Sequence, residues 1–533
     1  MANIFKQPCD ESVIGSGPCT APCAARLRGW ILAATVIGSS MAFIDGSAVN
    51  VALPALQSDL NATVADVQWI VESYALFLAA LLLVGGSLGD RFGRRRIFAA
   101  GVTLFALASV WCGLSPDVGQ LILARAVQGV GGALLVPGSL AIISASFTAE
   151  QRGRAIGTWS GFTAITAALG PVLGGWLVEN ISWRWIFFIN VPLAAVVLVI
   201  VARYLPESRN EESAVGLDWV GALLATFGLG AVVYGLIESA SLGFANPVVV
   251  SALVVGTVAL IGFVGVEWRS PAPMIPLHLF RSSTFSGANL LTLLLYAGLS
   301  GTLFFFPFNL IQVQGYSATA AGAAFLPFIL IMFLLSHWSG GLVHRYGAKL
   351  PLTVGPVIAA MGFALFALPE IGGNYWTTFF PAVMVLGLGM ALSVAPLSTA
   401  VMSGAKGRHA GVASGINNAV SRTAGLLAIA VMGVFVLYAF NSNLDSRVAT
   451  LEISPAAQEL LDAQRIKLAG AEVSIDLNPE LSTALERAID ESFVAGFRLI
   501  MLVAAGLALA SAITASLMIE GKKPAAARAR PRR

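Results

Sequence analysis

Three ionisable residues interrupt long apolar runs in the first quarter of the chain, and they are the side chains best placed to do chemistry. Asp45, Glu72 and Arg125 each lie in a stretch apolar enough to cross a membrane. A charged side chain costs about 2.5–3.5 kcal/mol near the centre of such a helix, so these residues are functional candidates. A buried carboxylate can take up a proton, and a nearby arginine opposes that step. We predict that Asp45 and Glu72 are proton-coupling sites, that Arg125 modulates them, and that the three can meet in one cluster.

The alternatives are structural. Asp45 could form a static ion pair, and Glu72 lies close enough to the end of its apolar run to reach interfacial water. Other polar residues within apolar runs are candidates for lining a substrate cavity: Asn50, Gln128, Asn417 and Arg422. Aromatic residues on the same runs suit amphipathic or aromatic substrates, often cationic ones.

The elements that position these residues are transmembrane helices. The chain has 533 residues, of which 57% are hydrophobic and 11% charged, whereas a soluble protein carries about 25% charged residues. Runs of about 20 apolar residues without polar alternation predict helices rather than barrel strands. Fourteen candidate spans lie at about 30–53, 67–88, 97–114, 119–143, 154–178, 184–204, 218–238, 247–267, 284–308, 319–342, 350–369, 376–400, 410–440 and 493–519.

Basic residues alternate between the loops and predict the topology. If the tail 1–29 is cytoplasmic, the arginines and lysines of the short loops fall on the same side, apart from Arg184, and so does the basic tail 520–533. An acidic loop, 441–492, then lies outside as a solvated cap, with a short surface helix at 456–468. The tail 1–29 shows no cleaved signal peptide, and its Cys19 and Cys23 have no partnering histidine, so an incidental role is favoured.

The loop between the second and third spans, Gly85–Arg96, combines glycines with charge. Its candidate gate residues are Gly86, Asp90, Arg91, Gly93, Arg94 and Arg95. Arginines alone would suffice for a topology signal, which is the simpler alternative, whereas the embedded acid and spaced glycines suggest contacts between helix ends. The loop is not a nucleotide-binding loop, because it lacks a Gly-Lys-Ser/Thr ending and a preceding strand.

A weaker copy of this loop follows in the second half of the chain, from Gly340 to Lys349. It keeps a glycine, an arginine, an aromatic residue, a glycine and a final basic residue, but His344 replaces the acid. We predict a second gate from His344, Arg345 and Lys349. The repeat implies two six-helix halves, 30–204 and 284–519, with two inserted helices in 205–283.

These patterns resemble the motifs of the major facilitator superfamily. Gly85–Arg96 is similar to motif A, and Asp45–Pro54 to a motif of fourteen-span drug:proton antiporters of the QacA/EmrB type. Arg125–Gly132 resembles motif B, and Trp183–Pro192 the entry to the sixth span. The segment that resembles motif C, the antiporter motif, contains Gly161, Gly170, Pro171, Gly174 and Gly175.

The resemblance implies an all-α major facilitator fold and export of drugs or other amphipathic molecules in exchange for protons, by alternating access. It implies that Arg125 takes part in proton transfer, and that the motif C segment lies between the halves and seals leakage. Export of one dedicated metabolite is the main alternative, followed by proton-coupled uptake and a non-transporting membrane sensor. Neither enzymatic activity, a cofactor nor a metal site is expected, and the net charge of +3 gives no basis for nucleic acid binding. The expected location is a bacterial inner membrane with both termini cytoplasmic; relatives sometimes pair with a periplasmic adaptor and an outer-membrane channel, which nothing in this sequence shows.

Overall fold

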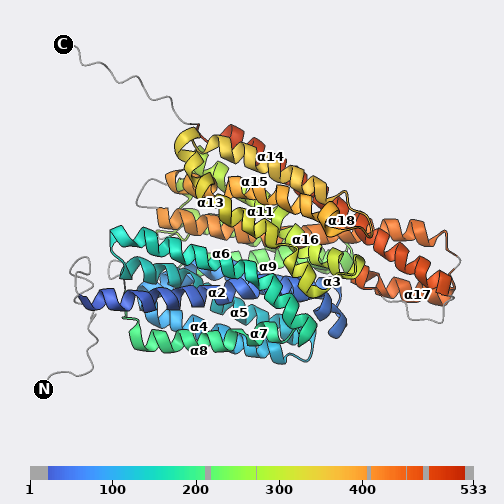
Figure 1. The fold of residues 1–533 in the computed structure, drawn as a ribbon, viewed down its shortest axis with the longest axis horizontal. Coiled ribbons are helices and arrows are strands. Elements are labelled where there is room, and N and C mark those ends of the chain that lie inside the picture. Colours follow the sequence, from blue (N-terminus) through green and yellow to red (C-terminus); the bar gives the residue numbers. More distant parts are fainter. Residues whose placement is uncertain are drawn as a thin grey trace, which may run out of the picture. The chain divides into compact units, whose positions relative to one another are not determined.

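The computed structural model describes residues 22–209, 218–271, 273–404, 410–451, 453–471 and 479–521, and all regular elements in these ranges are helical (Figure 1). Fourteen described segments are long and apolar enough to cross a membrane, which confirms the predicted number of spans and the all-α fold. Helices satisfy their own backbone hydrogen bonds, as a lipid environment requires.

The helices, in chain order, are α2 (Pro22–Asp59), α3 (Val64–Phe92), α4 (Arg94–Leu114), α5 (Val118–Ser146), α6 (Ala149–Asn180), α7 (Trp185–Phe188), α8 (Asn190–Tyr204), α9 (Trp219–Leu242), α10 (Pro247–Arg269), η1 (Leu277–Arg281), α11 (Ser283–Phe308), η2 (Asn309–Val313), α12 (Ala318–Ala323), α13 (Leu326–Tyr346), α14 (Lys349–Phe366), α15 (Tyr375–Gly404), α16 (Ala410–Val448), α17 (Pro455–Gln464), η4 (Arg465–Gly470) and α18 (Pro479–Met518).

The segment 441–492 is more structured than the solvated cap we predicted. Both flanking helices extend into it, because α16 continues to Val448 and α18 begins at Pro479. Glu491 pairs with Arg447 of α16 and with Arg487 one turn earlier on α18, which ties the two extensions together. Between them, α17 confirms the predicted short helix, and η4 follows it directly.

The chain forms two compact units. The first comprises Met1–Met274, Leu303–Phe325 and Ile429–Phe497, and the second comprises Ile275–Thr302, Leu326–Ala428 and Arg498–Arg533. This division differs from two six-helix halves, because parts of α11, α16 and α18 belong to the first unit. The predicted halves therefore remain a prediction.

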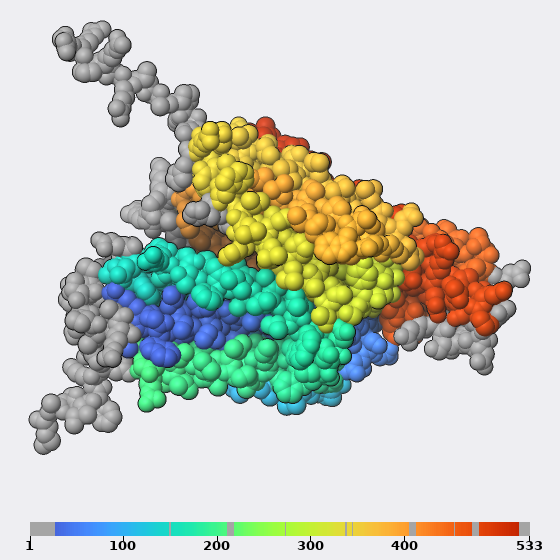
Figure 2. Space-filling view, viewed as in Figure 1, coloured from blue at the N-terminus to red at the C-terminus, as the bar shows by residue number. Residues whose placement is uncertain are grey.

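Close helix packing in the first unit depends on glycine. A Cβ on Gly129 would lie 2.5 Å from the carbonyl oxygen of Tyr74 on α3, and one on Gly131 would lie 2.7 Å from the backbone nitrogen of Phe105 on α4. Helices α3 and α4 thus approach α5 more closely than larger residues would allow. On another face, α2 lies between α6 and α8 (Figures 1 and 2). Asp45 lies on α2, the helix between these two neighbours.

The inserted pair α9 and α10 also packs through glycine. A Cβ on Gly256 of α10 would meet the backbone of Val232 on α9 at 2.8 Å. Helix α9 in turn contacts α3, where Gly230 lies against Leu76 and the rings of Trp69 and Tyr234 are 6.1 Å apart. The apolar side chains of α10 remain largely exposed, as expected for a helix that faces lipid.

In the second unit, α15 packs between α13 and α14. A Cβ on Gly362 of α14 would lie 2.6 Å from the backbone nitrogen of Leu386 on α15, so α14 and α15 also touch at a small residue. Small-residue contacts therefore recur in both units, in keeping with packing inside a membrane.

Candidate functional site

The first feature of the site is a buried ion pair between α2 and α5. Arg125 donates from Nη1 to Oδ2 of Asp45 at 2.5 Å, and the two side chains are 1% and 0% exposed. Arg125 also donates from Nε to the carbonyl of Ile70 at 3.1 Å, and its guanidinium lies 4.3 Å from the ring centroid of Tyr74. The arginine is thus held by a carboxylate, a carbonyl and an aromatic face at once.

The second carboxylate oxygen of Asp45 is held by two amides. Gln128 donates from Nε2 to Oδ1 at 2.8 Å, and Asn190 donates from Nδ2 to the same oxygen at 3.3 Å. Both amides are also within hydrogen-bonding distance of the Ser109 hydroxyl, at 2.9 and 3.3 Å. Oδ1 of Asn190 is a buried acceptor that receives no hydrogen bond. The resulting network, Asp45, Ser109, Arg125, Gln128 and Asn190, is called the polar cluster below.

Local structure explains why these side chains meet. Arg125 and Gln128 are three residues apart and therefore share one face of α5. Asn190 lies at the first position of α8, directly after the short α7, so its side chain enters the bundle from a break between helices. Sequence reasoning named Asp45, Gln128 and Arg125 but missed Ser109 and Asn190 as site residues. The only signal for Asn190 was its place in the Trp183–Pro192 segment.

Glu72 forms no hydrogen bond with the polar cluster. It is fully buried on α3, and neither of its carboxylate oxygens has a hydrogen-bond partner. One turn earlier, Gln68 donates to the carbonyl of Ile429 on α16 at 2.9 Å. Asp45 and Arg125 thus meet as we expected, whereas Glu72 does not join them.

The predicted gate loop connects α3 and α4 through Gly93, which has φ +109°. Asp90 accepts hydrogen bonds from Arg94 one turn later, at 2.8 Å. The loop also binds the segment that follows α8, because Glu207, three residues after the helix ends, accepts the backbone N–H of Arg95 at 3.0 Å and lies 3.6 Å from Nε of Arg96. Glu207 was not predicted as a gate residue.

Gly93 is required by the position of Glu207 as well as by its own backbone. A Cβ on Gly93 would lie 2.5 Å from Oε1 of Glu207, and L side chains rarely adopt its φ. Arg94 donates its backbone N–H to the carbonyl of Ser208 at 2.9 Å, and Arg95 donates a side-chain N–H to the carbonyl of Ala202 at 3.1 Å. The gate loop and the end of α8 are therefore one hydrogen-bonded assembly.

Comparisons with known proteins identify the family. The family model of the Major Facilitator Superfamily matches residues 35–429. The chain belongs to the Major Facilitator Superfamily. The tetracenomycin C resistance and export protein of Streptomyces glaucescens is 32% identical to it over 503 residues, covering 92% of each chain. The multidrug resistance protein Stp of Mycobacterium tuberculosis is 33% identical over 492 residues, covering 89% of this chain and 88% of the relative.

A solved structure with the same fold is that of a bacterial homologue of the human lysosomal transporter Spinster, in an inward-facing and unoccupied conformation. The TM-score is 0.63 at 16% identity, and the match covers 92% of this chain and 97% of that one. The likeness supports the major facilitator fold that was predicted. The curated relatives confirm the predicted kinship with drug efflux proteins.

In this major facilitator chain, the second copy of motif A forms the same kind of turn as the first. Gly347 has φ +80° and separates α13 from α14, as Gly93 separates α3 from α4. Arg345 lies 5.3 Å from the ring centroid of Tyr346, matching Arg91 over Phe92 at 5.7 Å. Lys349 begins α14. The side chain of His344 lies outside the described residues.

The motif C glycines of α6 face two neighbours. A Cβ on Gly174 would lie 2.8 Å from Cβ of Ala48, and one on Gly170 would collide with the Ser47 hydroxyl, so α6 packs tightly on α2. Gly175 approaches the backbone of Ala318 on α12. The backbone carbonyl of Pro171, also on α6, lies against Gly322 of α12. Gly161 has open space around it.

The remaining cavity candidates are dispersed. Asn50 is half-buried on α2, and Gln128 belongs to the polar cluster rather than to a described cavity. In the second unit, Asn417 of α16 donates to Asn289 and Thr292 of α11, at 3.2 and 2.7 Å. Arg422, also on α16, is half-buried. Within the described residues, no group of three or more side chains could hold a metal ion.

Proposed function

We propose that the chain exports drugs or other amphipathic small molecules across a bacterial cytoplasmic membrane in exchange for protons. The observation that carries this proposal is the Asp45–Arg125 pair, a carboxylate and an arginine buried together in the membrane-spanning part of the first unit. The relatives named for drug resistance and export support efflux as the direction. Such a pair is expensive to keep in a membrane, which favours a functional role over packing.

The polar cluster can exist in two protonation states. With Asp45 ionised, its carboxylate accepts from Arg125, Gln128 and Asn190. Protonation removes the charge that Arg125 balances and turns Asp45 into a donor. The unpaired Oδ1 of Asn190 is a buried, unused acceptor of the cluster, and a rotation of its amide would offer this acceptor to the new proton. Protonation thus weakens the attraction between α2 and α5.

Alternating access would use this change to bias two conformations. A proton can shift a conformational equilibrium only as far as its affinities for the two states differ. The ion pair supplies that difference, because a conformation that separates α2 from α5 makes Asp45 easier to protonate. Glu72 is a second candidate proton site, and it acts independently of Arg125 in this proposal.

The gate loop would act at the cytoplasmic end. Asp90, Arg94 and Glu207 join α3, α4 and the end of α8, so a change at the loop reaches three helices. The distribution of basic residues among the short loops supports a cytoplasmic location for this loop and for both termini. Small molecules and protons are the partners that the proposal requires.

Proton movement in inverted membrane vesicles tests the proposal. Vesicles that have acidified their interior are given tetracenomycin C or ethidium, and proton release is followed with a pH-sensitive dye. We expect substrate-dependent proton release with the wild-type chain and none with Asp45→Asn at equal expression. Substrate export that continues in the variant, or wild-type export without proton release, would refute the coupling.

A single dedicated substrate is the second candidate, because one relative is named for the export of one compound. Resistance profiles separate the two cases. Protection against several unrelated compounds supports multidrug export, and protection against one scaffold supports a dedicated exporter.

A further inference from the structure

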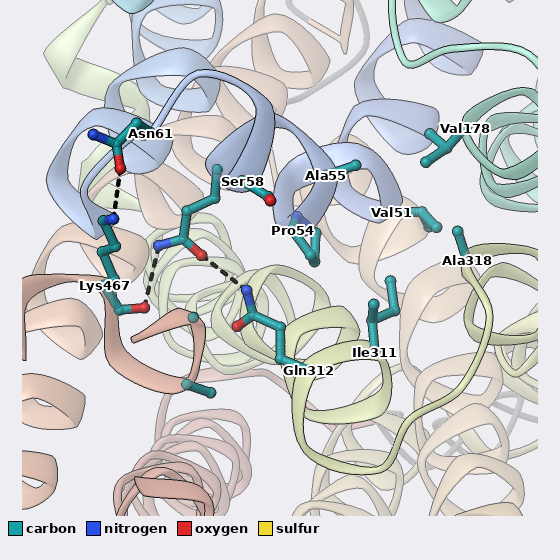
Figure 3. Close-up of a pocket in the computed structure, with 13 residues that line it drawn as sticks. Val51, Pro54, Ala55, Ser58, Asn61, Val178, Ile311, Gln312, Ala318 and Lys467 are labelled. Atoms are coloured by element: carbon teal, nitrogen blue, oxygen red, sulfur yellow. Dashed lines mark hydrogen bonds between the residues drawn. The ribbon is translucent and has the colours of Figure 1, made fainter. Parts of the chain in front are cut away.

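A cavity of about 430 Å³ is lined by residues of the first unit, none of which belongs to the polar cluster (Figure 3). Its volume is in the range of about 300–1,000 Å³ that is typical of small-molecule sites. The lining comes from the end of α2, from α6, η2, α12 and η4. Its residues are Val51, Pro54, Ala55, Gln57, Ser58, Asn61, Val178, Ile311, Gln312, Ala318, Lys467, Ala469 and Gly470.

One wall of the cavity is formed by polar residues that are joined to η4 by hydrogen bonds. Gln57 donates to the carbonyl of Lys467 at 3.2 Å and accepts from Gln312 at 2.9 Å, and Lys467 donates from Nζ to Asn61 at 2.6 Å (Figure 3). Gly470 packs closely on Gln57, because a Cβ on Gly470 would lie 2.9 Å from the side-chain oxygen of Gln57. The wall is therefore built by tertiary contacts.

The backbone at this wall is strained on both sides. Among the described residues, Asn61 with φ 49° and Leu468 with φ 54° are the two non-glycine residues with positive φ. They flank the Lys467–Asn61 hydrogen bond, and Leu468 is only 2% exposed. Positive φ at a residue such as Leu468 persists where the surroundings fix it, often at ligand sites.

The chemistry of the lining selects a ligand class. Val51, Val178 and Ile311 offer an apolar surface, and opposite them lies the polar wall (Figure 3). Lys467 is the only charged side chain among the described lining residues, and its ammonium has donors beyond the one used on Asn61. Oε1 of Gln312 is a buried acceptor without a hydrogen bond.

Two carboxylates follow lining residues in the sequence, and both are already engaged. Asp59 accepts from the indole of Trp183 at 2.8 Å and from Arg184 at 3.0 Å, and it lines a separate, adjoining hollow. Glu179 accepts from the hydroxyl of Thr319 at 2.5 Å and from its backbone N–H at 3.2 Å. Neither carboxylate lines the cavity, so a cation there would meet Lys467 as the one charged side chain of the described lining.

We propose that this cavity is a binding site for neutral or anionic amphipathic molecules that carry an N–H or O–H donor. The apolar body lies against Val51, Val178 and Ile311, the donor meets Oε1 of Gln312, and an acceptor or anion meets Lys467. The site excludes amphipathic cations. That its occupant is an exported compound rests on the proposed function; the binding itself does not.

Two matched fluorescent probes test the site at equilibrium, without a proton gradient. Dansyl-6-aminohexanoate is an anion and dansylcadaverine is a cation, and both carry the same naphthalene and sulfonamide N–H. Each is titrated into the purified full chain in nanodiscs. A charge-assisted hydrogen bond contributes about 1.5–3 kcal/mol, so we expect the anion to bind at least about tenfold more tightly than the cation.

Variants assign the binding to the cavity. Lys467→Gln should weaken anion binding about tenfold or more, and Lys467→Glu should reverse the order of the probes. Arg487→Gln is the matched control, because it removes an exposed cation of the same loop that does not line the cavity. Val178→Trp fills the cavity and should remove binding of both probes, even if substitutions at Lys467 displace η4.

The outcomes separate this inference from the proposed function. Equal affinities for the two probes in the wild-type chain, or anion binding that survives both Lys467→Gln and Val178→Trp, would overturn the site. Probe binding as expected in a chain that exports nothing would leave the site intact and refute the proposed export.

Discussion

Glu207 and Gly93 lie against each other so closely that only a glycine fits: a Cβ on Gly93 would be 2.5 Å from the Glu207 carboxylate. The carboxylate in turn accepts the backbone N–H of Arg95. The end of α8 is thereby fastened to the turn between α3 and α4. Motif A is thus completed by a residue more than one hundred positions later in the chain.

Gly93→Ala should damage this turn through both the clash and the positive φ. We expect a loss of about 1–3 kcal/mol in stability and a strong reduction in export. Thermal denaturation of the detergent-solubilised protein and efflux assays measure the two effects. Gly89→Ala is the control in the same motif, since its Cβ would meet nothing closer than 4.0 Å. Equal behaviour of the two variants would show that the contact with Glu207 is unimportant.

Asp90→Asn should cripple export while leaving substrate binding detectable, because the change weakens the attraction to Arg94 without altering the membrane-embedded part. Glu207→Gln should have a similar effect, since it removes the charge facing Arg96. Transport rates and equilibrium binding of the same compound are compared for each variant. Wild-type turnover in both would reduce the loop to a topology signal.

The Asp45–Arg125 pair predicts a non-additive result. Removing one partner of a buried pair typically costs about 3–5 kcal/mol, because it strands the other charge. We expect Arg125→Gln to lower the melting temperature more than the double variant Asp45→Asn/Arg125→Gln does. Both should lack proton-coupled export. Additive melting shifts would mean that the two side chains are not coupled.

Glu72→Gln should leave stability nearly unchanged, because neither oxygen of Glu72 has a hydrogen-bond partner to lose. If Glu72 carries a proton during transport, the number of protons released per exported molecule should fall in the variant. Simultaneous measurement of proton and substrate fluxes in vesicles gives that ratio. An unchanged ratio would exclude Glu72 from coupling.

Asn190→Leu tests the unused acceptor beside Asp45. The substitution removes a donor to the ionised carboxylate and an acceptor for the protonated one. We expect proton-coupled export to fall and its pH profile to shift, while Asn180→Leu, at the exposed end of α6, leaves both unchanged. A loss of export with an unshifted profile would point to a packing role.

Periodicity and hydropathy were sufficient to predict the spans. The cost of charge in lipid was sufficient to single out Asp45 and Arg125 as candidate site residues that could meet. Asn190 and Ser109 escaped prediction because a single polar residue near a helix break or inside a span has no sequence pattern of its own. Only the packing of α8 against α2, and of α4 against α5 and α8, reveals their roles. Glu207 looked like an ordinary charge after a span for the same reason.

The segment 441–492 shows a different limit. Its charges end the hydropathic signal, so the helices α16 and α18 seemed to stop where the apolar residues did. Ion pairs such as Arg447–Glu491 let both helices continue beyond that point. The burial of Leu468 could not be predicted either, because it depends on contacts of η4 with α2, α3 and η2.

The packing of α9 and α10 has a consequence for how far the rest of their unit depends on them. Helix α10 rests on α9, and α9 touches the remaining helices of its unit mainly through α3. A gene that lost the pair would expose Leu76 and Trp69 to lipid, which apolar side chains tolerate. The pair α9 and α10 is thus attached to its unit like an appendage, and its removal would leave the packing among α2, α5, α6 and α8 untouched.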